Sequence, residues 1–171
     1  MSYKFFSGFS LEGEEELFCE YENKNDFTIA GFSYGAIKAF KEAKESSYRV
    51  DLLQLFSPAF FQTQDKKFKR MQLMFLKKDS TAYCNNFLEN IAYPSSFNTN
   101  KYFKEGSYEE LEELLNYEWN KDELQDLVDR GTRVEIYLGG KDKIIDSKKA
   151  CEFFKEFGTV YFIKNSGHIL I

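Results

Sequence analysis

The stretch that decides the fold covers residues 27–40, FTIAGFSYGAIKAF, and its centre is the pentapeptide GFSYG at residues 31–35. Residues 27–30 have the apolar character of a strand, and residues 36–44 are rich in strong helix formers. The pentapeptide between them matches Gly-x-Ser-x-Gly, in which a sharp strand-to-helix turn holds a serine in a strained backbone conformation. Glycines two residues before and after Ser33 remove side chains that would collide in such a turn. The sequence therefore predicts a turn that projects Ser33; a glycine-rich turn around an ordinary serine is the alternative.

The same alternation of short apolar segments and helical patterns continues on both sides of this stretch. Further strands are predicted at residues 3–6, 48–56, 133–138 and 159–163. Helical patterns cover residues 11–22, 66–78, 81–91, 108–117, 122–130 and 147–157. Strands separated by helices are typical of a parallel sheet. The predicted fold class is therefore α/β, with about five mostly parallel strands in a doubly wound sheet with flanking helices.

One segment interrupts the alternation. Residues 57–132 separate the third predicted strand from the fourth, which is too long for a bare loop. Because the patterns in this segment are helical, we expect a helical lid at residues 58–120. The core is then formed by residues 1–57, which carry the Ser33 turn, and by residues 121–171. A chain of 171 residues suits a single domain of this kind.

Composition excludes several classes of protein. The sequence has 28 acidic and 23 basic residues, a net charge of −5, which argues against a nucleic-acid binder. Its 43% of hydrophobic residues predict a folded core. The three cysteines (19, 84 and 151) lack the spacing of a disulfide framework or a zinc site, and free thiols suit a reducing compartment. No apolar run approaches the ~20 residues of a membrane span, and residues 1–9 do not form a signal peptide. We expect a cytoplasmic protein that binds no nucleic acid, no membrane and no metal.

His168 is the only histidine in the sequence, and it follows the last predicted strand. A serine is a weak nucleophile at neutral pH and needs a base, most often an imidazole. Sites in α/β sheets lie at the carboxyl ends of the strands, so Ser33 and His168 are expected at the same edge. We therefore predict that His168 is the base for Ser33. A structural role for a lone histidine is the alternative.

A third residue, an acid, must orient the imidazole. Asp142 comes just after the fourth strand, in the sequence GGKD at residues 139–142. Asp146 is the alternative, but it precedes a helical pattern and is suited to cap that helix. Asp142 is therefore the favoured acid.

Acyl transfer at Ser33 also needs donors for a developing oxyanion. The backbone amide of Tyr34, directly after the serine, is the first expected donor. The second is expected from the loop after the first strand, where Gly8 lets the backbone approach closely, and we assign it to the amide of Phe9. A plain turn is the alternative for this loop.

The motifs at residues 31–35, 140–142 and 167–168, in the order Ser, Asp, His, resemble those of the α/β-hydrolase superfamily. More closely, the whole chain is similar to the compact pimeloyl-acyl-carrier-protein methyl ester esterases of biotin synthesis. This resemblance rests on FFSGF (5–9), FKRMQL (68–73) and YEELE (108–112) and extends to the end of the sequence. It implies a reduced α/β-hydrolase fold.

The resemblance also implies an activity. Ser33 would attack the methyl ester carbonyl while His168 takes its proton and Asp142 holds the histidine. The amides of Tyr34 and Phe9 would bind the oxyanion, methanol would leave, and water would release the pimeloyl carrier. The resemblance implies no cofactor, and an acyl carrier protein as partner. A thioesterase or a small-ester esterase, and a non-catalytic member of the fold, remain the alternatives.

Residues 65–78 (DKKFKRMQLMFLKK) hold six basic residues and one acidic residue. On a helix they place cations on one stripe (Lys66, Arg70, Lys77) and apolar residues on another (Phe68, Met71, Phe75). A solvated basic face and a docking surface for an acidic carrier are both consistent with this pattern. Candidates for carrier docking are Lys66, Lys69, Arg70 and Lys77, with Arg70 for a phosphate of the carrier's arm. Candidates for an acyl pocket, with core packing as the alternative, are Phe60, Phe61, Phe75 and Tyr34.

The sequence departs from larger α/β-hydrolases, because their first strands and their final helix have no counterpart here. That final helix normally covers one face of the sheet and steadies the histidine loop. We expect the 11–22 helix to cover this face instead, and we therefore favour a monomer, with a dimer as the alternative.

Overall fold

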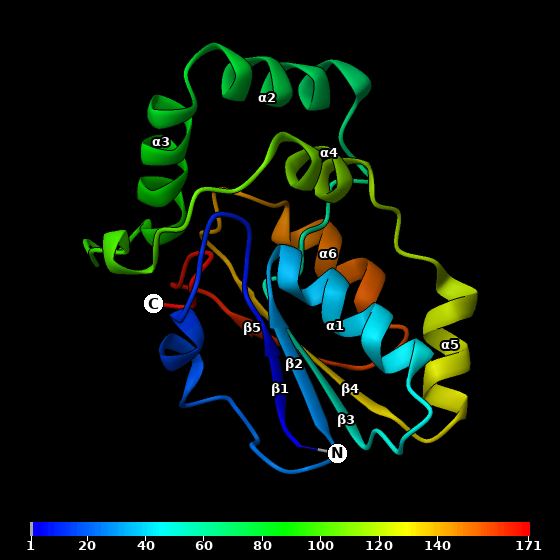
Figure 1. Cartoon of the computed structure of the whole chain (residues 1–171). Helices are drawn as coiled ribbons and strands as arrows, with labels where there is room; N and C mark the ends of the chain where they lie inside the picture. The colour runs from blue at the N-terminus through cyan, green and yellow to red at the C-terminus, as the bar shows by residue number, and fades with distance from the viewer. Residues whose placement is uncertain (1) are drawn as a thin grey trace.

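A parallel sheet of five strands lies at the centre of the molecule (Figure 1). The computed structural model describes residues 2–171. The strands lie side by side in chain order: β1 (Lys4–Phe6), β2 (Thr28–Phe32), β3 (Leu52–Phe56), β4 (Arg133–Gly139) and β5 (Thr159–Ile163). All four neighbouring pairs are parallel. The predicted α/β class with about five parallel strands is confirmed.

The register brings the strand ends level at one edge of the sheet. Phe32 lies opposite Phe56, and Phe56 lies opposite Tyr137. The ladder continues for one more step, because the Ser33 N–H donates to the Phe56 carbonyl at 2.9 Å and the Ser57 N–H donates to the Tyr137 carbonyl at 2.8 Å. Residues that directly follow β2 and β3 are therefore fixed by backbone hydrogen bonds at this edge.

Three α-helices cover one face of the sheet: α1 (Tyr34–Glu45), α5 (Lys121–Asp129) and α6 (Ser147–Phe154) (Figure 1). Their apolar sides pack on every second residue of the strands, as the alternation of side chains along a strand requires. On the opposite face, the end of α3 (Ser80–Ala92) packs near the carboxyl ends of the strands, where Leu88, Ile91 and Ala92 join the cluster of Phe32 and Phe56, so this face carries less α-helix than expected for a doubly wound sheet.

The opposite face is covered by η1 (Glu14–Phe18), a 3-10 helix, and the chain around it. The predicted helix over residues 11–22 is wrong in type and length, because Gly13 has a left-handed conformation (φ 79°) and Glu14 turns its side chain inward. Phe18 is fully buried, and its ring centroid lies 4.8 Å from those of Phe32 and Phe56. The segment therefore covers the middle of this face, as expected, while Tyr161 on β5 remains 44% exposed.

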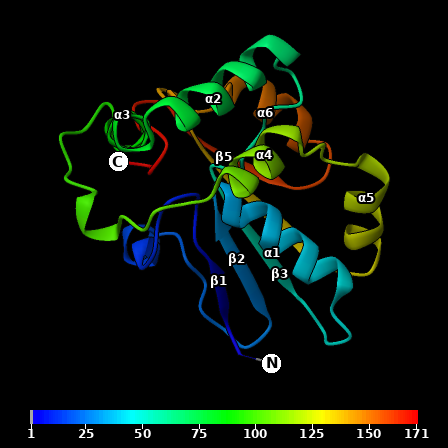
Figure 2. The same cartoon turned by 45° about the horizontal axis from the view of Figure 1, so that its top comes forward.

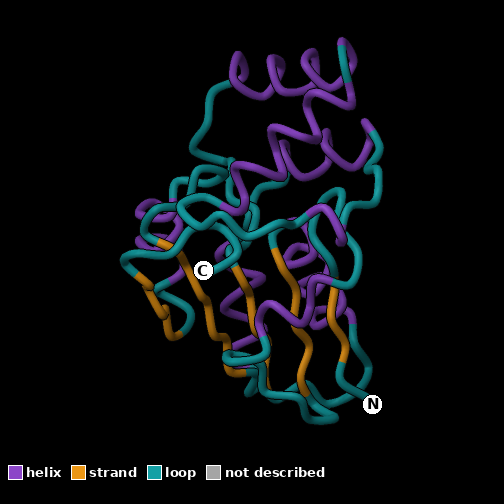
Figure 3. The backbone as a smooth tube through the Cα atoms, turned by 90° about the vertical axis from the view of Figure 1, so that its left-hand side faces the viewer, coloured by secondary structure: helices purple, strands orange, loops and turns teal. Residues whose placement is uncertain are grey.

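Residues between β3 and β4 form a helical layer beyond the carboxyl ends of the strands (Figures 1 and 3). It contains α2 (Lys66–Lys78), α3 (Ser80–Ala92), the short η2 (Asn100–Tyr102) and α4 (Tyr108–Asn116). α2 contacts both α3 and α4, whereas α5 packs against α1 beside the sheet (Figure 2).

Two predicted elements are too long. β3 begins at Leu52 rather than at residue 48, since Tyr48 is 69% exposed and the chain there forms a turn. α6 ends at Phe154 rather than at residue 157. Within residues 2–171, every helix is too short or too polar to span a lipid bilayer.

Candidate active site

Ser33 occupies the tight turn between β2 and α1. Its backbone is strained, with φ 54° and ψ −115°. A Cβ atom at Gly31 would lie 2.2 Å from the carbonyl oxygen of Gly35, and one at Gly35 would lie 1.9 Å from that of Phe6. Both glycines are therefore required by close backbone contacts, as the sequence pattern predicts.

A chain of hydrogen bonds links Ser33, His168 and Asp142. The distance from His168 Nε2 to Ser33 Oγ is 2.9 Å, and the distance from His168 Nδ1 to Asp142 Oδ2 is 2.6 Å. The side chains of His168 and Asp142 are fully buried. The carboxylate accepts from Nδ1–H, so Nε2 keeps a lone pair that can accept the serine proton.

Backbone amides fix the carboxylate of Asp142. Its Oδ1 accepts hydrogen bonds from the N–H groups of Ile144 at 2.6 Å and Ile145 at 3.0 Å. Asp146, the alternative acid, instead caps α6 by accepting from the Lys149 N–H at 3.0 Å. The fold therefore brings Asp142, and not Asp146, to the imidazole.

The chain around His168 is held by contacts with Ser57, directly after β3, and with α3. The Ser57 hydroxyl donates to the His168 carbonyl at 2.6 Å, and the Ile169 N–H donates to the carbonyl of Ile91 in α3 at 3.3 Å. Ile169 and Leu170 are buried, and the imidazole packs on Phe32 with a centroid distance of 5.0 Å. Sequence reasoning missed Ser57, although it follows β3 directly, as Ser33 follows β2.

Glycines also let the loops that carry Asp142 and His168 touch. A Cβ atom at Gly139 would lie 2.1 Å from the carbonyl oxygen of Gly167, and one at Gly167 would lie 1.6 Å from that of Tyr93. This backbone contact sets the distance between the acid loop and the histidine loop.

The two residues predicted to supply oxyanion donors come from the start of α1 and from the loop after β1. Tyr34 is the first residue of α1, where a backbone N–H has no acceptor within the helix. Phe9 is buried, and it lines the same cavity as Ser33.

Glu14 supports the loop that carries Phe9. Its Oε1 accepts a hydrogen bond from the Gly8 N–H at 2.7 Å. The side chain is fully buried, its Oε2 has no partner within residues 2–171, and this burial raises the pKa of the carboxyl. Sequence reasoning did not identify Glu14, because nothing local to it indicates a contact with Gly8.

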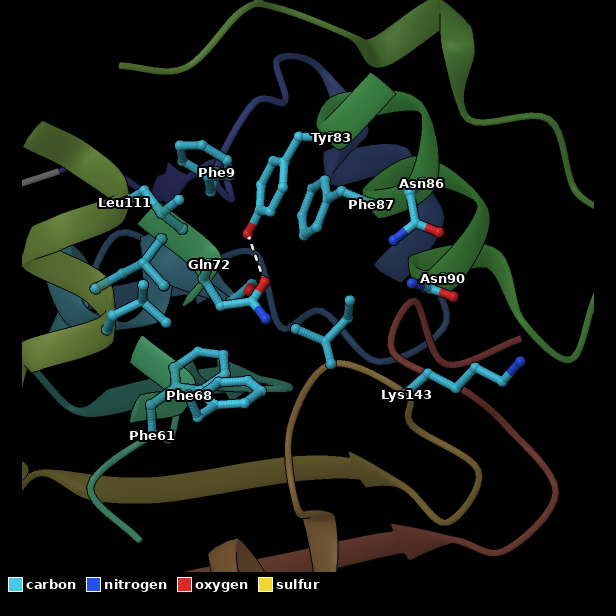
Figure 4. A pocket seen from close by; sticks show the side chains of 14 residues that line it. Phe9, Phe61, Phe68, Gln72, Tyr83, Asn86, Phe87, Asn90, Leu111 and Lys143 are labelled. Carbon is cyan, nitrogen blue, oxygen red and sulfur yellow. Dashed lines mark hydrogen bonds between the residues drawn. The ribbon is translucent and has the colours of Figure 1, made fainter. Parts of the chain in front are cut away.

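Ser33 lies in the wall of a cavity of about 180 Å³ under the helical layer (Figure 4). Eight of its lining side chains are apolar: Phe9, Phe61, Phe68, Phe87, Leu111, Leu114, Leu115 and Ile144. Besides Ser33, the other lining side chains are polar: Gln72, Tyr83, Asn86, Asn90 and Lys143. A mainly apolar lining with a few polar groups suits an apolar chain that also carries polar groups.

Only one of the four predicted acyl-pocket residues, Phe61, lines this cavity. Phe60 packs in the core against Phe153 and Phe154. The Tyr34 side chain is directed to the helical layer, where its hydroxyl donates to Glu113 in α4 at 2.6 Å. Phe75 lies outside the cavity and is 43% exposed.

The basic residues predicted for docking lie on α2. Lys66, Arg70 and Lys77 are exposed and Lys69 is half-buried, and none of the six cations of α2 forms an ion pair within the described residues. The predicted apolar stripe is only partly covered, because Phe68 lines the cavity while Met71 and Phe75 are exposed. Leu76 is the buried residue of this helix.

In the part of the chain that the structure describes, no three His, Cys, Asp or Glu side chains gather as metal ligands would. The three cysteines are free thiols.

Comparisons with solved structures identify the fold. An esterase from Exiguobacterium antarcticum (EaEST) matches with a TM-score of 0.66 and 21% identity over 82% of this chain, which spans only 59% of that protein. A hydrolase from Oleispira antarctica, olei00960, matches with a TM-score of 0.75 and 13% identity, covering 98% of this chain and 84% of that one. BioG from Haemophilus influenzae matches with a TM-score of 0.61 and 11% identity, covering 98% and 88%.

No protein-family model and no curated protein matches the sequence. The five parallel strands, the turn at Ser33 and these structural matches together define a reduced α/β-hydrolase fold. At identities this low, the similarity establishes the fold alone.

Proposed function

We propose that this protein is a serine esterase in which Ser33 is the nucleophile, His168 the general base and acid, and Asp142 the residue that orients the histidine. One observation carries this proposal: the hydrogen-bonded chain Ser33–His168–Asp142, with the imidazole and the carboxylate fully buried at the carboxyl edge of the sheet. An imidazole held in this way increases the nucleophilicity of a serine hydroxyl.

The reaction follows from these positions. Ser33 Oγ attacks the ester carbonyl while Nε2 of His168 takes its proton. The amides of Tyr34 and Phe9 stabilise the oxyanion of the tetrahedral intermediate. His168 then donates the proton to the departing alcohol, and an acyl-enzyme forms on Ser33. Water, activated by the same imidazole, releases the carboxylate and restores the serine.

We propose further that the substrate is the methyl ester of a pimeloyl group carried by an acyl carrier protein. The resemblance of residues 5–9, 68–73 and 108–112 to pimeloyl-carrier methyl ester esterases favours this substrate. The mainly apolar cavity at Ser33 suits a methylene chain. The unpaired cations of α2 suit an acidic carrier.

Hydrolysis of the pimeloyl-carrier methyl ester by the wild type and by Ser33→Ala tests this proposal. We expect free pimeloyl carrier and methanol from the wild type alone. A short p-nitrophenyl ester is assayed beside it, and so is a pimeloyl carrier thioester without the methyl group. Cleavage of the short ester without cleavage of the carrier methyl ester would reject the substrate and retain the esterase. Faster cleavage of the thioester bond would favour a thioesterase. Equal activity in Ser33→Ala would reject the site.

A further inference from the structure

A second hollow, of about 440 Å³, lies in the elbow between α2 and α3. Phe75 and Lys78 line it from α2, and Ala82 lines it from α3. Three further residues, Gln72, Tyr83 and Asn86, line both this hollow and the Ser33 cavity. The two spaces therefore adjoin at these three side chains.

The side chains at this junction are polar and offer hydrogen bonds. The Tyr83 hydroxyl donates to Gln72 Oε1 at 3.1 Å and so links α3 to α2 (Figure 4). Burial raises the pKa of Tyr83 from 10 to about 12, so this hydroxyl is a donor throughout the neutral range. Within residues 2–171, the amide nitrogen of Gln72 and the whole amide of Asn86 form no side-chain hydrogen bond. These groups are matched to amides of a ligand, since an amide both donates and accepts.

The outer end of the elbow has a different character. Phe75 is 43% exposed there, and the cation of Lys78 is followed directly by the carboxylate of Asp79, which lines the same hollow. The elbow thus joins a polar junction to the mainly apolar cavity at Ser33. The amides and then the acyl chain of a long substrate arm would meet suitable groups in the same order.

We infer that the α2–α3 elbow binds the amide-bearing thioester arm of an acyl carrier, and that Gln72, Tyr83 and Asn86 are specificity residues that admit the arm to the Ser33 cavity. The inference rests on the proposed function and adds the route by which the substrate reaches the serine. The competing route passes Asn90 and Lys143, which line only the inner cavity.

Substitution of Ala82 tests the route by filling the elbow. Ala82→Trp places an indole in the outer hollow, because Ala82 lines that hollow and not the Ser33 cavity. Thr81→Trp is the matched control, since Thr81 is exposed on the same turn of α3 and lines neither space. Asn90→Trp obstructs the competing route.

Two methyl esters serve as probes: the methyl ester of pimeloyl-phosphopantetheine, which has the arm, and dimethyl pimelate, which has the same acyl chain without it. We expect Ala82→Trp to raise the KM for the arm-bearing ester about tenfold or more. For dimethyl pimelate we expect the kcat/KM of Ala82→Trp to stay within about twofold of the wild-type value. We expect Thr81→Trp to leave kcat/KM unchanged for both esters.

Three outcomes would overturn the inference. In the first, Asn90→Trp raises the KM for the arm-bearing ester while Ala82→Trp does not, which assigns the arm to the other route. In the second, Ala82→Trp impairs both esters equally, which indicates a general disturbance of the lid. In the third, the wild type hydrolyses both esters with equal kcat/KM, which shows that the arm is not recognised. A wild type that is inert on both of these esters and on short p-nitrophenyl esters would instead reject the proposed function itself.

Discussion

Two carboxylates four residues apart, Asp142 and Asp146, differ in their partners, and this difference predicts different consequences of the same substitution. Asp142→Asn replaces the oxygen that accepts from His168 Nδ1 by a group that can donate, which favours the wrong tautomer. We expect kcat to fall by about 10⁴-fold. Asp146→Asn is the matched control, because asparagine caps a helix as well as aspartate does. Steady-state kinetics of both variants on a short ester provide the measurement, and equal losses would contradict the assignment.

Glu14 predicts a dependence of stability on pH. Burial raises its pKa in the folded protein above the ordinary value of 4.5, so the folded state binds the proton more tightly than the unfolded chain. The stabilisation from the protonated carboxyl is complete below pH 4.5 and is lost as the pH rises through the folded pKa. Glu14→Gln, which cannot ionise, removes this dependence.

We therefore expect the free energy of unfolding of the wild type, relative to Glu14→Gln, to decrease from pH 4.5 upward. Urea titrations of both proteins at several pH values between acid and neutral measure the difference. Glu20→Gln is the control, because Glu20 is exposed. A constant difference between the wild type and Glu14→Gln across this range would contradict the assigned environment.

At the residue scale, sequence reasoning identified side chains whose role follows from local chemistry and from the end of a strand. Ser33 lies in a recognisable turn, and Asp142 and His168 each follow a strand that ends at the same edge. Glu14 and Ser57 could not be identified, because their partners, Gly8 and the His168 carbonyl, are set by the tertiary fold. The pairing of a buried acid with a backbone amide leaves no periodic signal in the sequence.

At the scale of elements, α2 has two different sides. Its cavity side carries Phe68 and Gln72, while its cations form no ion pair within the described residues. If these cations steer an acidic carrier, charge reversal affects the encounter with the carrier and not the chemistry at Ser33.

The double variant Lys69→Glu/Arg70→Glu is therefore expected to raise the KM for the carrier-linked methyl ester about tenfold, with kcat for a short ester unchanged. The effect should shrink as salt is added, since exposed charges are screened. Lys148→Glu/Lys155→Glu, at α6, changes the net charge equally and is the control. Equal effects of the α2 variant on both substrates would contradict docking on this helix.

The starts of helices with capping residues were predicted to within two residues. Asp65 caps α2 through the Phe68 N–H, and Ser107 and Glu110 form a reciprocal capping box at α4. The 11–22 segment misled the prediction, because the inward turn of Glu14 and the conformation of Gly13 break a pattern that is helical in composition. The apolar stripe of α2 does not indicate burial, because Met71 and Phe75 are apolar and yet exposed.

At the scale of the whole molecule, η1 and the end of α3 cover most of the sheet face opposite α1, α5 and α6. Phe18 and its neighbours bury the middle of that face, and β5 is the edge with the exposed Tyr161. We therefore expect a monomer of 20.2 kDa by light scattering at micromolar concentration. A dimer that persists on dilution would contradict this expectation and would point to the β5 edge, which Tyr161→Lys should then disrupt.

The central claim is that Ser33 is a nucleophile activated by His168, and covalent labelling with a fluorophosphonate tests it most directly. The account predicts stoichiometric labelling of the peptide that contains residues 31–35, no labelling of Ser33→Ala, and much slower labelling of His168→Ala. Labelling of Ser33→Ala at the wild-type rate, or an unlabelled but folded wild type, would contradict it.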